Sequence, residues 1–590
     1  MLQLPYLVLT LAAVALSPVG AAVTCKCLPG DPCFPSQGTI SAFEKNLAHP
    51  LINPRPVAAV CFPQDPSFNA AACDAVKKNW NNGVFRASLP NTYQFTSWES
   101  IINTTTIEQC DPFGNVNDPA DVCFQGRVPW GVVNVTKVSD IQNTLLFASK
   151  HNLKLVVKNT GHETLGRSAG QGSIMLWTHN LQDIDFSDNF VPKGAPHGTQ
   201  GASTVTIGAG VNWAQVYDAV AVRDKVIVGG IGAGGTVGAG GGWPMGGGHS
   251  ILSPFYGLGV DNIVEETVVL PNGNFVTANK YTNPDLFWAL RGGGGPSFGI
   301  LTSVTYLTHP SEPVTAAFLV SHTTSDEGRL ALFNEWVKAH PALLDAGWAG
   351  FWPYKDNQFF LTLMALGNPP TNPKANSTLQ TFYDTISQIP GVVIDLEVTK
   401  PYTGFQQWYD ENFIDSQKGI GFNYTVGDFS GVPLAAASVL IPRSNFENNT
   451  EALAKALTAL DDARPFLIGG GAVSKPDPDE MAVNPAFRVM LSDLTIALSW
   501  NSTTATPQDI LAVRKNVTRL ADGVRAVATD AGAYINEAEI FEPNFQKSYW
   551  GDNYPRLRDF KRKLDPKDLL IVHQGVNSEG WDDEVICKTV

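Results

Sequence analysis

The sequence predicts an α+β protein with more than one domain. At 590 residues the chain is too long for a single hydrophobic core. Strand-like apolar runs, such as 153–157, alternate with segments of helical spacing, such as 140–151 and 213–222. From residue 313 onward strands and helices are expected to mix again, without the glycine-rich loops of the earlier part. We therefore expect a layered architecture with one domain boundary near residue 310.

The first 123 residues are expected to hold a leader and an extension. A short apolar run at 7–16 is followed by small residues at 17–22, a pattern typical of a signal peptide, here over residues 1–21. The run is too short to span a bilayer, and no later run is suited to do so. Residues 22–123 are rich in Cys, Pro and Asn and show little periodicity, so we expect a disulfide-stapled extension.

Cysteines, sequons and charge predict a secreted, extracellular glycoprotein. The eight cysteines are an even number, and only His49 lies among the first seven, which favours disulfides over a zinc site. We expect no metal ion. The net charge of −15 argues against a nucleic-acid partner. The sequons for N-glycosylation are Asn103, Asn134, Asn376, Asn423, Asn448, Asn501 and Asn516.

Two loops of the first domain are candidates for binding an anion. Between Gly229 and Gly248, twelve of twenty residues are glycine. Because glycine loses the most backbone entropy on folding, this density indicates close approach of the backbone to a ligand. The second loop, 159–168, reads NTGHETLGRS and follows the apolar run 153–157. Backbone N–H groups in such loops are suited to phosphate.

Four other interpretations of these loops are weaker. Gly230–Gly235 matches the dinucleotide motif GxGxxG, but eight glycines or prolines in the next thirteen residues exclude the helix that this motif requires. Ser168 lies in a GxSxG pattern, but a strand rather than a helix is expected after it. His162 lacks the second histidine of a zinc protease. A flexible linker would not contain Trp243 or lie between strand-like runs.

Four separated segments resemble one flavoprotein family. They are VVKNTGHETLGRSAGQGSIMLW, TVGAGGGWPMGGGHSILSPFYGLGVDNI, DLFWALRGGGGPSFGIL, and the closing run from YINEAE through YWGDNYPRLRDFKRKLDP to VHQGV. In this order they resemble the berberine-bridge-enzyme-like branch of the vanillyl-alcohol oxidase superfamily, which has a PCMH-type FAD-binding domain. Secreted fungal members similar to isoamyl alcohol oxidase resemble the chain most.

The resemblance implies both a domain plan and a cofactor. It implies a two-part PCMH-type FAD-binding domain over residues 124–310. A substrate domain over 311–530 would contain an antiparallel sheet covered by helices. A berberine-bridge-like segment over 531–590 would return to the FAD domain. The implied cofactor is FAD.

The resemblance also implies how FAD is attached. In this family the histidine of the loop that contains His162 is joined covalently to the flavin, a role suited to neutral imidazole. Members with two covalent bonds carry a cysteine where this chain has Gly234, so a single bond through His162 is implied. The other implied cofactor-binding residues are Asn159, Thr160, Gly161, Glu163, Thr164, Gly166, Arg167, Ser168, Gly234, Gly235, Thr236, Gly238, Gly241, Gly248 and Ile300.

Substrate oxidation also needs a group that accepts the substrate proton. Family members often use a tyrosine or a carboxylate, and Tyr534 is the candidate here, with Asn536 positioning the tyrosine ring or the substrate. A buried core tyrosine is the structural alternative for Tyr534. Glu537 occupies a position where the family often has another tyrosine.

We expect a secreted FAD-dependent oxidoreductase. It would be an oxidase that moves a hydride from an alcohol or from a secondary-metabolite C–H group to the flavin and then to O2, giving H2O2. Its partners would be a small-molecule substrate and O2, with no nucleic acid and no membrane. The alternatives are a carbohydrate oxidase on the same scaffold and a non-catalytic secreted glycoprotein that retains the fold.

Overall fold

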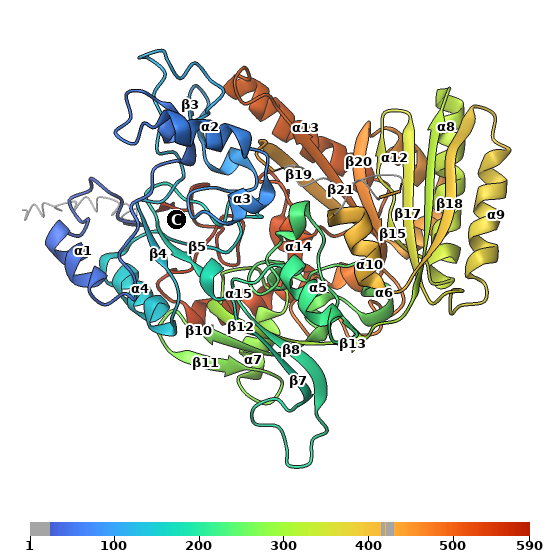
Figure 1. Ribbon diagram of the computed structural model, residues 1–590, viewed down its shortest axis with the longest axis horizontal. Coiled ribbons are helices and arrows are strands. Elements are labelled where there is room, and N and C mark those ends of the chain that lie inside the picture. The colour runs from blue at the N-terminus through green and yellow to red at the C-terminus, as the bar shows by residue number, and fades with distance from the viewer. Residues whose placement is uncertain (1–23, 415–418, 421–429, 590) are drawn as a thin grey trace, which may run out of the picture.

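The computed structural model describes residues 24–414, 419–420 and 430–589, and Figure 1 shows their arrangement. The predicted signal peptide and the sequon at Asn423 lie outside the described residues. The protein is α+β, as predicted, with small sheets in its first half and one large antiparallel sheet covered by helices in its second half. Within the described ranges, no helix combines the length and the apolar character that crossing a bilayer requires.

The cysteine-rich extension is more helical than its sequence indicates. It contains α1 (Gln37–Glu44), α2 (Ala70–Lys78), α3 (Gly83–Ala87), β2 (Ile101–Ile102) and β3 (Ile107–Glu108). The three helices are preceded by Ser36, Asn69 and Asn82, whose side chains accept hydrogen bonds from N–H groups of the first turn. Helices this short have too few turns to show periodicity, so these caps are their main sequence signal.

A small parallel sheet supports the loop that contains His162. Its strands, in spatial order, are β4 (Gly131–Asn134), β6 (Ile174–Trp177) and β5 (Leu155–Lys158). Helix α4 (Val138–His151) connects β4 to β5, as parallel pairing requires a crossover. The Asp140 carboxylate closes the first turn of α4 by accepting from the Lys137 N–H at 3.1 Å. The His162 loop begins directly after β5.

A five-stranded antiparallel sheet supports the glycine tract. Its strands, in order, are β11 (Phe275–Ala278), β10 (Ile263–Val269), β12 (Ile300–Leu307), β8 (Ala202–Gly208) and β7 (Ile184–Phe190). The hairpin turn between β10 and β11 contains Asn272 and Gly273, and Gly273 has φ 85°. Strand β7 was not predicted, because its sequence IDFSDNF contains residues of low strand propensity, and it forms through pairing with β8.

Short helices and strands flank this sheet. Helix α5 (Trp213–Ala221) ends shortly before the glycine tract and buries Trp213 and Tyr217. The remaining short elements are β9 (Lys225–Val226), α6 (Ser253–Tyr256), α7 (Pro284–Leu290), β13 (His309–Pro310) and α10 (Phe405–Tyr409).

The second half of the chain forms an eight-stranded antiparallel sheet. Its strands, in order, are β18 (Val392–Tyr402), β14 (Val314–Thr323), β17 (Gln358–Leu366), β15 (Ala349–Phe351), β20 (Asp462–Leu467), β21 (Met490–Ser499) and β19 (Leu434–Pro442), with β16 (Tyr354–Lys355) paired to β17 and β20. One face is covered by α8 (Asp326–Asp345), α9 (Ala375–Ser387), α11 (Arg443–Asn448), α12 (Thr450–Thr458) and α13 (Pro507–Arg525). The opposite face turns toward the glycine tract.

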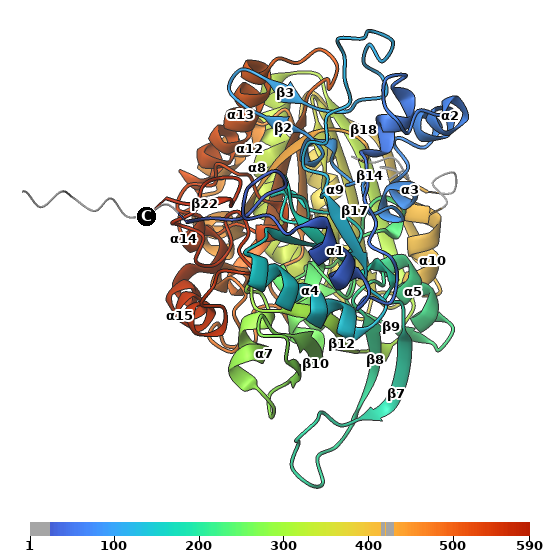
Figure 2. The same ribbon diagram turned by 90° about the vertical axis from the view of Figure 1, so that its left-hand side faces the viewer.

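The last segment of the chain lies against the first domain (Figure 1 and Figure 2). It contains α14 (Phe545–Trp550), α15 (Tyr554–Leu564) and β22 (Cys587–Lys588). Trp550 Nε1 donates to the Gly292 carbonyl at 3.0 Å, and buried Lys561 donates to the Ser297 carbonyl at 2.7 Å. Both acceptors belong to the glycine-rich run after α7, so the end of the chain packs against the base of the first domain.

All eight cysteines form disulfides, which settles the pairing that the sequence left open. The pairs are Cys25–Cys587, Cys27–Cys33, Cys61–Cys73 and Cys110–Cys123. The first of these joins β1 (Thr24–Cys25) to β22, which also pair as strands. The Cys25–Cys587 bond therefore links the two ends of the described chain.

Removing Cys25–Cys587 should cost more stability than removing Cys27–Cys33. The sequence separations are 562 and 6 residues. Because disulfide stabilisation grows with the logarithm of the closed loop, the chain-entropy difference is about 4 kcal/mol. We expect the C25S/C587S variant to unfold at a lower temperature than C27S/C33S in scanning calorimetry. Equal unfolding temperatures would contradict this expectation.

Candidate functional site

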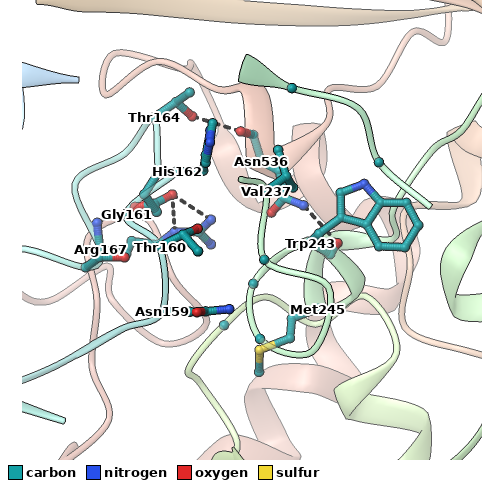
Figure 3. Close-up of a pocket in the computed structure, with 18 of the residues that line it drawn as sticks. Asn159, Thr160, Gly161, His162, Thr164, Arg167, Val237, Trp243, Met245 and Asn536 are labelled. Atoms are coloured by element: carbon teal, nitrogen blue, oxygen red, sulfur yellow. Dashed lines mark hydrogen bonds and ion pairs between the residues drawn. The ribbon is translucent and has the colours of Figure 1, made fainter. Parts of the chain in front are cut away.

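A cavity of about 320 Å³ lies where the His162 loop, the glycine tract and the large sheet meet. Figure 3 shows His162 and Arg167 on one loop and Trp243 and Met245 on the other, with Asn536 between the two loops. The volume lies within the range typical of small-molecule sites. The two loops that were singled out in the sequence therefore line one cavity side by side.

His162 is half-buried at the edge of this cavity. Its Nε2 lies 2.7 Å from Oγ1 of Thr236 in the glycine tract, and its ring stands edge-on to Phe95 with the centroids 6.4 Å apart. Burial, with a smaller contribution from Lys158, lowers its pKa to about 4. The imidazole is therefore neutral at neutral pH. Among the described residues no hydrogen-bond partner engages Nδ1, which leaves that nitrogen available to a ligand.

Lys158, the last residue of β5, is a second unusual group beside the cavity. Its Nζ donates to the Leu89 carbonyl at 2.8 Å and lies 5.9 Å from the centroid of the Tyr93 ring. Burial lowers its pKa to about 7. When Lys158 carries its charge, that charge opposes protonation of His162. Lys158 thus adds a smaller contribution to the effect of burial, which keeps the imidazole of His162 neutral.

Two side chains of the His162 loop carry buried polar atoms without partners in the described structure. These atoms are Nδ2 and Oδ1 of Asn159 and Nη1 of Arg167. The other Arg167 nitrogens bind the Glu163 carboxylate at 2.8 and 2.9 Å. Both Asn159 and Arg167 line the cavity. Since buried polar groups are normally hydrogen-bonded, they fit a ligand rich in donors and acceptors, such as the phosphates and ribose of FAD.

Two glycines permit close packing around the His162 loop, Gly161 against the N-terminal extension and Gly238 against Asn159. Gly161 has φ 84°, and a Cβ there would lie 3.1 Å from Cα of Tyr93. A Cβ on Gly238 would lie only 2.5 Å from Nδ2 of Asn159. A side chain at either position would displace the backbone or the Asn159 amide that faces the ligand.

Most of the residues that the sequence implied for cofactor binding line the cavity. These are Asn159, Thr160, Gly161, His162, Glu163, Thr164, Arg167, Ser168, Gly238, Gly241 and Ile300. Thr236 reaches the site through its hydrogen bond to His162. Gly166, Gly234, Gly235 and Gly248 are not among the lining residues. A Cβ on Gly166 would meet the Trp98 ring at 2.3 Å, and one on Gly248 the Trp243 ring at 2.7 Å, so these two glycines accommodate tryptophans.

Tyr534 and Asn536, the candidate catalytic residues, also reach the cavity. The Asn536 Nδ2 donates to the Tyr534 hydroxyl at 2.7 Å and to the Trp243 carbonyl at 3.0 Å. Tyr534 is only 2% exposed. Burial, followed by the charge of Glu537, raises the pKa of Tyr534 far above its usual value. The phenol therefore keeps its proton at neutral pH, whatever part it takes in the reaction.

The large sheet supplies the opposite, substrate-side wall. Its three lining strands contribute alternate residues, because successive side chains of a strand point to opposite faces. The lining pairs are Leu434 and Ala436 of β19, Arg464 and Phe466 of β20, and Thr495 and Ala497 of β21. Most of these side chains are apolar, so this wall is suited to a small substrate with an apolar body.

His249 and Asp493 lie at the site although the sequence did not single them out. His249 lines the cavity, and its Nε2 is 3.1 Å from Oε1 of Glu537 and 3.7 Å from Oδ2 of Asp493. The signals that could have indicated them are weak. His249 directly follows the last glycine of the tract, and Asp493 is a charged residue inside the apolar strand sequence MLSDLTIALS.

The neutral histidine, the polar atoms that lack partners among the described residues and the glycine-dependent loop contact together define a nucleotide-cofactor site of the flavoprotein type. Comparison with known proteins supports this class. Residues 129–279 match the family model described as an FAD binding domain, and residues 533–577 match the model described as berberine and berberine like.

Relatives and solved structures identify the family. An FAD-linked oxidoreductase of Arthroderma benhamiae is 35% identical over 580 residues, covering 96% of each chain. The FAD-linked oxidoreductase asqF of Emericella nidulans is also 35% identical, over 593 residues and 96% of each chain. The crystal structure of the VAO-type flavoprotein MtVAO615 of Myceliophthora thermophila matches with a TM-score of 0.82 at 29% identity, covering 95% of this chain and 98% of that one. The chain belongs to the berberine-bridge-like FAD-linked oxidoreductases of the vanillyl-alcohol oxidase superfamily.

Gly238→Ala should abolish cofactor retention. The added Cβ would collide with the Asn159 amide, so we expect the FAD content per polypeptide, measured by absorbance, to fall at least tenfold. Gly523→Ala is the matched control, because its Cβ on helix α13 meets nothing within 4 Å and alanine favours helices. The control should keep its FAD. Full FAD retention by G238A would contradict the assigned loop contact.

Proposed function

We propose that the protein is a secreted FAD-dependent oxidase of small alcohols or of activated C–H groups in secondary metabolites. The observation that carries this proposal is the enclosed, neutral His162 beside buried polar atoms that lack partners. Bound FAD supplies the ring that accepts a hydride from the substrate and passes the electrons to O2, giving H2O2. The protein supplies binding, orientation and proton transfer.

His162 is the proposed single covalent anchor of FAD. A tautomer with its proton on Nε2 donates to Thr236 and presents the Nδ1 lone pair to the ligand. Gly234 stands where a second, cysteinyl bond would need a thiol, and every cysteine of the chain is in a disulfide. Asn159 and Arg167 would hold the polar part of the cofactor through the atoms that have no partner among the described residues.

The substrate would bind between the cofactor loops and the large sheet. Leu434, Ala436 and Phe466 give its binding wall an apolar surface, which favours a small, weakly polar alcohol over a sugar. Arg464 and Thr495 add polar groups on the same wall. Oxygen uptake on matched panels of alcohols and sugars separates the two substrate classes, and no uptake on either panel would favour a non-catalytic glycoprotein.

His162→Ala is the direct test of the anchor. In the wild type, we expect the flavin absorbance to remain with the protein pellet after acid precipitation, because a covalent bond survives unfolding. In H162A the flavin should appear in the supernatant. His322→Ala is the control, since His322 pairs with Asp395 at 2.8 Å on the outer part of the large sheet. Release of flavin from the wild type would refute the covalent bond.

Secretion would be accompanied by N-glycosylation at exposed sequons. Asn103, Asn376, Asn448 and Asn501 are exposed, whereas Asn134 and Asn516 are half-buried. We expect glycans first at the exposed positions, because the transferase needs access to the side chain. Peptide mass spectrometry of protein secreted by a fungal host, before and after glycosidase treatment, measures site occupancy. Unmodified peptides at all four exposed sequons would contradict this proposal.

A further inference from the structure

Three ionisable side chains from distant parts of the chain meet beside the substrate wall. His249 follows the glycine tract, Asp493 lies in the middle of β21, and Glu537 belongs to the C-terminal segment. Their closest atoms are 3.1 Å apart for His249–Glu537 and 3.7 Å apart for His249–Asp493. Both contacts use the same nitrogen, Nε2. Thr495 also hydrogen-bonds the second oxygen of Glu537.

Asp493 cannot carry a negative charge here at low cost. Its side chain is completely buried, and neither oxygen has a hydrogen-bond partner in the described structure. It lies two residues before Thr495, so it faces the cavity side of β21. Burial, followed by the charge of Glu537, raises its pKa well above the usual value. Asp493 therefore keeps its proton at neutral pH.

Glu537 is the more accessible carboxyl group of the pair. Its side chain keeps 24% exposure and lines the cavity. The carboxylate accepts one hydrogen bond from the His249 ring and one from Thr495, and each oxygen retains a lone pair for the substrate. Other ionisable side chains that line the cavity in the described part of the chain include Tyr534, whose phenol is protonated, and Arg464 on β20.

We propose that Glu537 is the group that takes the substrate proton, with His249 and Asp493 as its positioning residues. This inference rests on the proposed oxidation of an alcohol. The O–H bond of the substrate breaks and an O–H bond to a Glu537 oxygen forms. The electron pair of the neighbouring C–H bond leaves as the hydride that bound FAD accepts, so the alcohol becomes a carbonyl compound. Asp493 keeps its own proton throughout.

Tyr534 has a different part in this scheme. Its hydroxyl accepts a hydrogen bond from Asn536, and its ring packs against His249 with the centroids 5.1 Å apart. Because the phenol stays protonated, it can donate to a substrate oxygen but does not act as the base. In this scheme Glu537, three positions later, is the proton acceptor that the sequence suggested Tyr534 to be.

Protonation states give a test that needs no substrate. Infrared difference spectra at pH 7 between wild type and D493N should show a lost carbonyl band of a protonated carboxyl group. Wild type minus E537Q should show lost bands of an ionised carboxylate. Glu266→Gln is the matched control, because Glu266 is another buried carboxyl, unpartnered in the described structure, with a pKa raised to about 8. Carboxylate bands lost in D493N would overturn the proposal.

Reduction of the bound flavin by alcohols under nitrogen gives the second test. For the best reductant from a panel of primary alcohols, E537Q should be reduced at least 100-fold more slowly, in line with the usual contribution of a general base. The wild-type rate should fall as pH falls, since a protonated Glu537 cannot accept a proton. This decrease, the acid limb of the pH profile, should be absent in E537Q. E537D should restore part of the rate. Y534F and E266Q should keep the acid limb.

The outcomes distinguish this inference from the function on which it rests. If the wild type holds flavin but no alcohol reduces it, the proposed substrate class fails, and the infrared spectra still decide the protonation states. An acid limb that survives in E537Q and disappears in Y534F would overturn the assignment to Glu537. A stoichiometric divalent cation in the isolated protein, measured by mass spectrometry, would also overturn the assignment. His249, Asp493 and Glu537 could then be ligands of that cation.

Discussion

One short segment near the C-terminal end, residues 534–538, holds the two cofactor loops together. Asn536 donates to the Trp243 carbonyl of the glycine tract. On the other side, Thr164 of the His162 loop donates to the Asn536 carbonyl and accepts from the Ala538 N–H, each at 3.1 Å. Gly246 allows this contact, since a Cβ there would come within 2.4 Å of the Asn536 amide. The two loops enclose the cavity because Thr164 hydrogen-bonds Asn536 and Ala538, which are 372 and 374 positions later in the chain.

The two faces of the large sheet contact different surroundings, a helix-covered core on one side and the cavity on the other. One face packs under α8, α12 and α13 in a core that contains Trp336 and Trp352. The other face meets the first domain and gives the cavity its apolar wall. The alternation of side chains along β21 therefore determines which residues support the core and which can reach a substrate. Asp493 is costly in such a strand, which fits a role in the site better than a role in the core.

Burial rather than ion pairing sets the protonation states around the site. Desolvation is the largest contribution to the shifted pKa of His162, Lys158, Tyr534 and Asp493. Desolvation keeps the imidazole of His162 neutral and leaves Lys158 only partly protonated near pH 7. It also keeps the protons on the phenol of Tyr534 and on the carboxyl group of Asp493. Glu537 differs from these groups because it remains partly exposed and has hydrogen-bond donors. The cavity that is suited to a flavin therefore contains one carboxyl group, that of Glu537, that is suited to proton transfer.

The sequence by itself determined the α+β class, the two cofactor loops and the membership of a flavoprotein family, because these depend on local patterns: apolar periodicity, glycine density and short contiguous motifs. It also indicated His162, since the residues around it form one continuous loop. It did not reveal β7, the short helices of the extension, the disulfide pairing or the contact of His249 with Asp493. Strand pairing, disulfide pairing and the contact between His249 and Asp493, which are 244 positions apart, depend on how distant segments pack. The same packing determines how far each side chain is buried, and burial in turn determines its charge. Only the tertiary structure decided which of the polar residues near Tyr534 can exchange a proton.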